Sequence, residues 1–198
     1  MSGDEPVAGV VLAAGAAERM GAPKQLLPWR GIPLVGHVVA AAERSRLDPV
    51  IVVTGANADA VEAALALTRA SAVRNPDHRR GNLSSLRCGV EAAPAAPAVV
   101  LLLGDMPDVA TDAIDAMVAV WEADHPWAAV TAYRDRVAHP FLLSRRALDE
   151  AFDLEDAKPL WRLLVAGDDA RVARVGRDEA APADLDTPEE YRAFLERG

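Results

Sequence analysis

Three short and continuous apolar segments stand out along the first half of the chain. They are residues 7–13, 49–54 and 98–103. Unbroken rather than alternating apolarity predicts strands that are buried on both faces, as in a parallel sheet covered by helices. Between and after these segments, apolar residues recur every three or four positions, which predicts amphipathic helices. The predicted helices are residues 33–44, 57–69, 83–93 and 111–123.

The second half of the chain carries weaker versions of the same patterns. They predict strands at residues 128–133 and 171–175 and short helices at residues 144–152 and 159–166. The start of the last helix is the most clearly marked, with a capping Thr187, a first-turn Pro188 and Glu190 at the capping-box position. The alternation of strands and helices predicts one α/β domain over residues 1–198, with a doubly wound, Rossmann-like, mostly parallel sheet and helices on both faces.

Composition and charge narrow the classes of function. The chain of 198 residues has a net charge of −9, which argues against nucleic-acid binding. Its single cysteine, Cys88, excludes an intrachain disulfide and fits a reducing compartment. The first residues are acidic, unlike a secretory signal, and the longest aliphatic run, residues 99–103, is far shorter than the ~18–20 residues of a membrane helix. We therefore expect a cytoplasmic protein without nucleic-acid or membrane partners.

The loop at residues 14–25 is the first candidate site, because ligands of open α/β sheets bind beyond the carboxyl ends of the strands. Its small residues would let backbone amides approach a phosphate, and Arg19 and Lys24 add positive charge. Neither a Walker loop nor a dinucleotide fingerprint is present. An ordinary connecting loop with a solvated arginine and lysine remains the alternative.

Carboxylates supply the second candidate. Asp105 directly follows the most hydrophobic predicted strand, where it is well placed to bind Mg²⁺ together with substrate phosphates. Asp184 and Asp186, just before the last helix, are a source of further carboxylates for the same ion. Taken alone, each of these residues is more often a turn or helix-capping residue than a metal ligand.

A basic stretch in this acidic chain is the third candidate. Residues 69–87 contain one carboxylate, Asp77, and five arginines: Arg69, Arg74, Arg79, Arg80 and Arg87. Within it, residues 81–87 place amide and hydroxyl donors at the start of a predicted helix, which suits an anion or the edge of a nucleotide. The alternative is a solvated surface with a capping serine.

Five segments, in order, resemble the MobA-like nucleotidyltransferases, and most closely the branch that contains molybdenum cofactor cytidylyltransferase. They are LAAG-x-x-x-RMG-x-x-K-x-LLP at residues 12–28, GNLSSLRCGV at 81–90, GDMP at 104–107, His139-Pro140, and DLDTPEEY at 184–191. The resemblance runs from about residue 8 to the end of the chain. It implies a fold like that of the nucleotide-diphospho-sugar transferases.

The resemblance also implies a reaction and a set of site residues. An oxygen of a phosphorylated acceptor, here molybdopterin, would attack the α-phosphorus of a nucleoside triphosphate and release pyrophosphate. Ala14, in LAAG rather than LAGG, favours CTP. The implied nucleotide contacts are Leu12, Ala13, Ala14, Gly15, Ala16, Ala17, Arg19, Lys24, Ser84, Ser85, Arg87 and Gly104. The implied catalytic residues are Arg19, Lys24 and Asp105. Mg²⁺ would be held by Asp105, Asp184 and Asp186. The acceptor would be contacted by His139, Lys158 and Trp161.

The sequence departs from the family pattern mainly in the acceptor half. Ala17 replaces a serine or glycine, Ala138 replaces a glycine or asparagine, and residues 155–161 depart from the segment Gly-Asp-x-Gly-Ala-Arg. Two alternatives therefore stay open. One is the same chemistry on phosphoenolpyruvate or phospholactate with GTP. The other is a non-catalytic nucleotide- or cofactor-binding accessory protein, with a molybdoenzyme or its maturation factor as partner.

Overall fold

A seven-stranded sheet forms the centre of the molecule. The computed structural model describes residues 6–16, 22–154, 159–166 and 169–197. Within these residues the strands of the sheet are β1 (Ala8–Ala13), β4 (Val50–Thr54), β5 (Ser71–Arg74), β6 (Ala98–Leu103), β7 (Ala128–Ala132), β8 (Val137–Ser144) and β9 (Val172–Gly176). Their order is β5-β4-β1-β6-β8-β7-β9, and of these described strands only β8 runs antiparallel to its neighbours.

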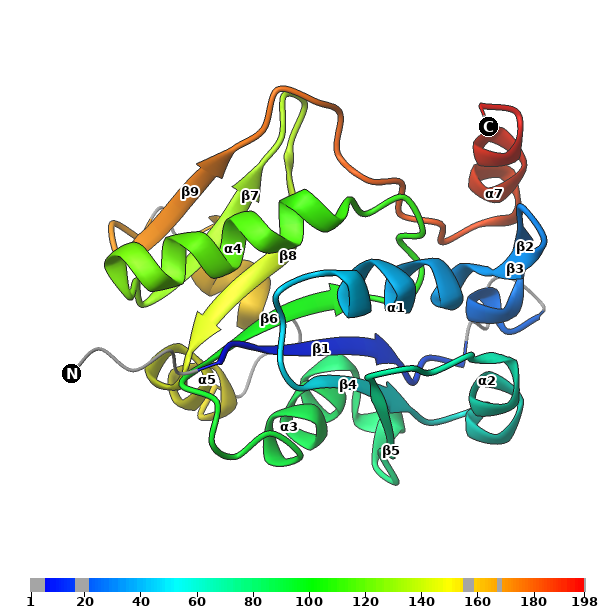
Figure 1. The fold of residues 1–198 in the computed structure, drawn as a ribbon, viewed down its shortest axis with the longest axis horizontal. Helices are drawn as coiled ribbons and strands as arrows, with labels where there is room; N and C mark the ends of the chain where they lie inside the picture. Colours follow the sequence, from blue (N-terminus) through cyan, green and yellow to red (C-terminus); the bar gives the residue numbers. More distant parts are fainter. Residues whose placement is uncertain (1–5, 17–21, 155–158, 167–168, 198) are drawn as a thin grey trace.

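Helices cover both faces of this sheet, as the apolar pattern predicts. They are α1 (Leu34–Arg44), α2 (Ala58–Ala64), α3 (Asn82–Glu91), α4 (Thr111–Asp124), α5 (Arg145–Phe152), α6 (Pro159–Trp161) and α7 (Pro188–Leu195), with short turns η2 (Lys24–Leu26) and η3 (His78–Arg80) and the π-helical η4 (Arg162–Ala166). One core lies between the sheet and α1 and α4, and a second lies between the sheet and α3, α5 and η4 (Figure 1). The predicted doubly wound, mostly parallel fold is confirmed. No helix in the described ranges is both long and apolar enough to cross a membrane.

Two strands of the sheet are missing from the sequence prediction. The expected helix at residues 57–69 ends at Ala64, and the chain then becomes extended and continues into β5. The Glu43 carboxylate accepts hydrogen bonds from the backbone N–H groups of Thr68, Arg69 and Ala70, which fixes the bend that leads into β5. The other missing strand, β8, contains Pro140, a residue that argues against a central strand.

The carboxyl ends of β1, β4 and β6 meet at one edge of the sheet, on the right in Figure 1. The loop after β6 is held tightly against the end of β1, because the Gly104 N–H donates to the Leu12 carbonyl oxygen at 2.9 Å. A Cβ at position 104 would lie 2.9 Å from that same oxygen, so only glycine fits without a shift. This close approach places Asp105 next to the first loop.

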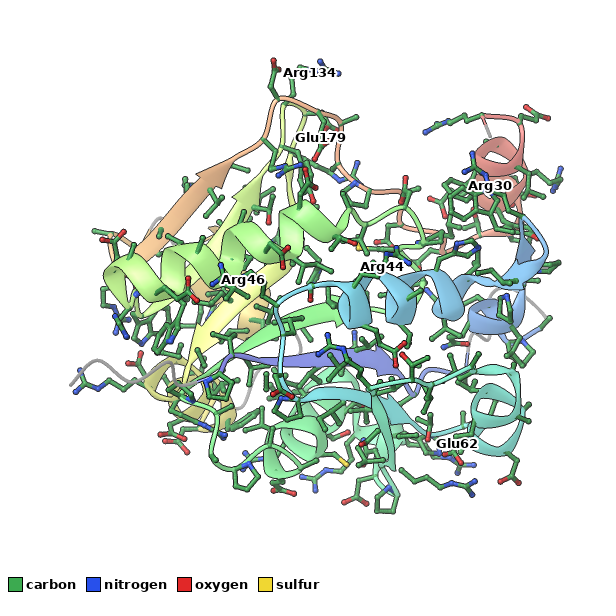
Figure 2. All side chains as sticks on the ribbon, viewed as in Figure 1. Arg30, Arg44, Arg46, Glu62, Arg134 and Glu179 are labelled. Atoms are coloured by element: carbon green, nitrogen blue, oxygen red, sulfur yellow. The ribbon has the colours of Figure 1, made fainter. Side chains whose placement is uncertain are left out.

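A small third core anchors the C-terminal helix at the same edge. Phe194 of α7 packs with Leu34, Leu185 and Trp29. Trp29 belongs to a hairpin of β2 (Pro28–Trp29) and β3 (Ile32–Pro33), and Figure 2 shows Arg30 of its turn beside α7. The predicted capping box at the start of α7 is present in full, with the Thr187 side chain accepting from the Glu190 N–H. These contacts fix residues 184–186 near Asp105.

We expect Gly89→Ala to destabilise the protein, because Gly89 of α3 packs tightly against side chains of β1 and β4. A Cβ there would lie 2.5 Å from Val10 Cγ1 and 3.0 Å from Val53 Cγ2. Overpacking of this kind costs about 1–3 kcal/mol. Urea unfolding measures the loss, and Gly176→Ala, where a Cβ meets nothing within 4 Å, is the matched control. Equal stability of Gly89→Ala and wild type would show that α3 can move away from the sheet without cost.

Candidate active site

Four charged side chains converge at the carboxyl edge of the sheet. Asp105 follows β6, Asp184 and Asp186 precede α7, and Lys24 starts η2. One carboxylate oxygen of each aspartate lies within 4.8 Å of the others. Lys24 Nζ donates to Asp186 Oδ1 at 2.6 Å and forms an ion pair with Asp105 Oδ2. The structure therefore brings together the lysine and all three aspartates that the sequence singled out.

Burial makes the electrostatics of this cluster strong. The side chains of Lys24 and Asp105 are only 15% and 13% exposed. Burial alone would lower the pKa of Lys24, but the neighbouring carboxylates of Asp105 and Asp186 outweigh it and raise the pKa above its usual value, so the amine is charged at neutral pH. Burial and the two neighbouring carboxylates raise the pKa of Asp184. Three carboxylates around one ammonium leave the cluster with an excess of negative charge.

The chemistry of these donors suits a hard divalent cation. Carboxylate oxygens are the ligands that Mg²⁺ and similar ions prefer. Asp105 Oδ1 is buried and has no hydrogen-bond partner among the described residues. A bare buried acceptor of this kind is costly unless a cation or a donor satisfies it. The three aspartates thus fit a metal ion, with Asp105 as the most deeply buried of them.

The segment that carries Asp184 and Asp186 is held by residues that the sequence reasoning missed. Asp108 Oδ1 accepts a hydrogen bond from the Ala183 N–H at 3.0 Å, and Arg136 Nη2 donates to the Pro182 carbonyl oxygen at 2.6 Å. Leu185, between the two aspartates, is only 1% exposed. Asp108 lies three residues after Asp105, and its position in the same loop is the only feature of the sequence that could have pointed to this role.

The backbone of the first loop is fixed from two sides. The Ala14 carbonyl oxygen accepts from the Ala56 N–H at 3.1 Å, and the Gly15 carbonyl oxygen accepts from Gln25 Nε2 at 3.0 Å. Gln25 is only 3% exposed, and its Oε1 is buried without a hydrogen-bond partner among the described residues. Sequence reasoning missed Gln25, although it stands directly beside Lys24.

The other implied site residues, in this loop and in two further segments of the chain, fall into three groups. Leu12 and Ala13 are buried at the end of β1, and Gly15 and Ala16 are exposed at the edge of the sheet. The N–H of Gly104 is taken by Leu12, so this amide is not available to a nucleotide. Ala17, Arg19 and Lys158 lie outside the described residues.

The residues expected at the third candidate site have different hydrogen-bond partners. Asn75, directly after β5, donates through Nδ2 to both Ser84 Oγ and Ser85 Oγ at 3.0 Å. Arg87 instead covers the ring of Phe152 at 4.2 Å and donates to the Phe152 carbonyl oxygen at 3.2 Å. Ser84, Arg87 and Phe152 help to line one groove of about 600 Å³. Asn75 was missed because β5 was missed.

Two of the implied acceptor residues lie in the described part of the chain. His139 is on β8, two residues before Phe141, which pairs with Leu101 of β6, so it lies near the carboxyl end of β6. Its ring stacks on Phe141 with centroids 4.1 Å apart, and burial lowers its pKa to about 3, which leaves it neutral at physiological pH. Trp161, at the end of α6, is 51% exposed.

A family model for the MobA-like NTP transferase domain matches residues 9–172 of this chain. The chain belongs to this family. Molybdenum cofactor cytidylyltransferase of Escherichia coli K12 is 27% identical over 192 residues, which cover 95% of each protein. Purine catabolism protein PucB of Bacillus subtilis 168 is 30% identical over 193 residues, or 92% of this chain and 93% of PucB. Bifunctional protein GlmU of Rhizorhabdus wittichii RW1 is 32% identical over 205 residues, and there the match covers 90% of this chain but 43% of GlmU.

Solved structures share the fold of this chain. Rv0371c from Mycobacterium tuberculosis H37Rv has a TM-score of 0.86 and 35% identity, with 98% of this chain and 100% of that chain covered. A structure of Rv0371c in complex with manganese has a TM-score of 0.81 at the same identity and coverage. CMP:2-keto-3-deoxy-manno-octonic acid synthetase complexed with CTP, at 19% identity and a TM-score of 0.74, covers 97% of this chain and 99% of its own, and shares the fold. The fold is that of the nucleotide-sugar-transferase-like nucleotidyltransferases, as expected.

Proposed function

We propose that this chain transfers CMP from CTP to molybdopterin in a Mg²⁺-dependent reaction that releases pyrophosphate. The observation that carries the proposal is the cluster of Lys24, Asp105, Asp184 and Asp186, which lies beside the first loop at the carboxyl edge of the sheet. A binding protein needs contacts to phosphate, but it has much less use for a buried group of metal-binding carboxylates. The cluster therefore favours turnover over simple binding.

Asp105, Asp184 and Asp186 would hold the metal ion. The manganese complex of Rv0371c, a relative at 35% identity, supports a divalent cation in this part of the family. Such an ion supplies positive charge that neutralises the triphosphate and favours the departure of pyrophosphate. Mg²⁺ is proposed because it commonly binds through one or two carboxylates together with substrate phosphates.

The chain's own residues position the two substrates and balance charge. The small residues from Ala13 to Ala17 would bring backbone N–H groups close to the phosphates, and Arg19 and Lys24 would hold the triphosphate. A phosphate oxygen of the acceptor forms a bond to the α-phosphorus, and the bond from that phosphorus to the bridging oxygen of the β-phosphate breaks. The electron pair leaves with pyrophosphate. Negative charge therefore builds up on the leaving group, where Arg19 and Lys24 stabilise it.

The choice of acceptor rests on the Escherichia coli molybdenum cofactor cytidylyltransferase, which matches 95% of this chain. The proposed acceptor residues, His139, Lys158 and Trp161, belong to the part of the chain that follows β7. Since burial lowers the pKa of His139 to about 3, its ring would orient an acceptor as a neutral hydrogen-bonding group and not as a cation. Exposed Trp161 offers a flat apolar surface for a pterin ring.

Release of pyrophosphate tests the proposed reaction. The purified protein is incubated with Mg²⁺, molybdopterin and, in separate samples, CTP, GTP or ATP. We expect release with CTP that requires both the acceptor and the metal ion. Release with GTP and phosphoenolpyruvate or phospholactate, and none with molybdopterin, would show that these are the substrates and that the proposed pair is wrong. An absence of release with every pairing, although nucleotide binds, would favour an accessory protein.

Gln25→Met is expected to raise the KM for the nucleotide by roughly 2- to 12-fold, because one neutral hydrogen bond contributes about 0.5–1.5 kcal/mol. Methionine keeps the length and apolar body of glutamine but cannot donate to the Gly15 carbonyl oxygen, so the first loop loses one of its two anchors. Steady-state kinetics with varied CTP measures the effect. An unchanged KM at unchanged thermal stability would show that Gln25 does not position the loop for the nucleotide.

A further inference from the structure

Lysine is rare in this chain, and one of its lysines lies in the carboxylate cluster. The sequence has two lysines, Lys24 and Lys158, against nineteen arginines. An arginine carries a planar and extended charge, whereas the ammonium of lysine is a compact point charge with three donors. A compact cation is the kind of group that can take the place of a metal ion among carboxylate oxygens.

Lys24 lies where a cation bound by the aspartates would lie. Its Nζ contacts Asp105 Oδ2 and is 2.6 Å from Asp186 Oδ1. These two residues and Asp184 are the group whose oxygens come within 4.8 Å of one another. An ion such as Mg²⁺ binds its oxygen ligands at about 2.0–2.1 Å, so an ion shared by Asp105 and Asp186 and the ammonium of Lys24 would occupy nearly the same position.

We propose that Lys24 and a divalent cation exchange on the carboxylates, so that entry of the metal displaces the ammonium toward the triphosphate. This inference rests on the proposed function, since it assigns the same cluster to a metal ion and a nucleotide. It adds a switch. Lys24 forms ion pairs with Asp105 and Asp186 in one state and binds phosphate in the other.

The exchange couples the metal to the nucleotide. Without a triphosphate, the metal must break the ion pairs of Lys24 with no new partner for the ammonium, so the metal alone binds weakly. With a triphosphate, the displaced ammonium gains phosphate oxygens, and the two ligands favour each other's binding. Because such coupling is reciprocal, each ligand raises the affinity of the other by the same factor.

Acetylation of the lysine amines tests the displacement in the wild-type protein. The protein is treated briefly with an amine-reactive acetyl ester, and mass spectrometry compares the Lys24 peptide with an unrelated lysine-containing peptide added to the same sample as reference. We expect Mn²⁺ to raise the acetylation rate of Lys24 severalfold relative to this reference peptide, and added CTP to lower it again. Potassium chloride at equal ionic strength should leave the ratio unchanged. A constant ratio while Mn²⁺ is bound would overturn the exchange.

A second experiment measures the binding of Mn²⁺ itself. The electron paramagnetic resonance signal of free Mn²⁺ decreases as the ion binds to the protein. Lys24→Met should bind Mn²⁺ at least roughly tenfold more tightly than wild type when no nucleotide is present, because the competing charge is gone. Arg134→Met, which removes a charge at a 66% exposed side chain, should match wild type. If Lys24→Met binds Mn²⁺ no more tightly than wild type, the exchange is wrong. If no variant binds Mn²⁺ with or without CTP, the proposed function fails with it.

Discussion

Replacing Asp105 with asparagine is expected to lower the rate of pyrophosphate release by roughly 10²–10³-fold or more. Asparagine has nearly the same shape, so the change removes one negative charge, one proposed metal ligand and the ion pair with Lys24. The affected carboxylate is 13% exposed and forms an ion pair with Lys24. Binding of the nucleotide without metal should survive, since the proposed phosphate loop at residues 14–25 does not include Asp105. Pyrophosphate release and equilibrium binding of CTP, measured on the same preparation, separate the two effects.

Asp178→Asn is the control for this substitution. It makes the same chemical change at a carboxylate that is 99% exposed, whose ion pair with Arg134 is 4.0 Å long. This variant should keep the wild-type rate. If Asp105→Asn keeps that rate as well, the carboxylate cluster has no part in turnover.

Lys24→Met is expected to lower kcat by roughly 10²–10³-fold, which corresponds to ~2.7–4 kcal/mol of lost transition-state stabilisation. The physical reason is that the charge on the departing pyrophosphate would lose a cation that the proposed mechanism assigns to it. Methionine preserves the apolar stem of the side chain, which limits damage to packing. The loss should appear in kcat more than in KM, because leaving-group charge develops during the reaction.

The thermal stability of Lys24→Met must be checked beside its rate. Removing the ammonium deletes the ion pairs that Asp105 and Asp186 form with Lys24 in the wild type. Added Mn²⁺ should restore the melting temperature of the variant, since the metal replaces the lost cation. A kcat within threefold of wild type, with the fold intact, would contradict the role assigned to Lys24.

The features that could be predicted from sequence are those encoded locally. Residues 7–13, 49–54 and 98–103 are continuous apolar runs, and each forms a buried strand that is covered by helices on both faces. The capping box of Thr187 and Glu190 involves neighbours in the chain and forms as expected. The convergence of Asp105 and Asp184 was predictable for a further reason, since one follows the central strand and the other occurs in a motif shared with the family.

The features that were missed depend on contacts between distant residues. β5 has the unremarkable sequence SAVR and becomes a strand by pairing with β4, after a bend that Glu43 of α1 fixes through the backbone N–H groups of residues 68–70. Without β5, Asn75 could not be placed at the edge of the sheet beside Ser84. Gln25 likewise gains its importance from burial against Gly15, which no local pattern shows.

Thermal unfolding of the wild-type protein with CTP, measured with and without Mg²⁺, tests the central claim most directly. Ligand at 100 times its dissociation constant adds ~2.7 kcal/mol of stability, which corresponds to a rise in Tm of roughly 5–10 °C for a chain of this length. We predict that rise when CTP and Mg²⁺ are present together, and a much smaller one with either alone. The same experiment on Asp105→Asn should show no benefit from Mg²⁺. A Tm that does not respond to CTP, GTP or ATP under any of these conditions would contradict the assignment of this edge of the sheet to a nucleotide and a metal ion.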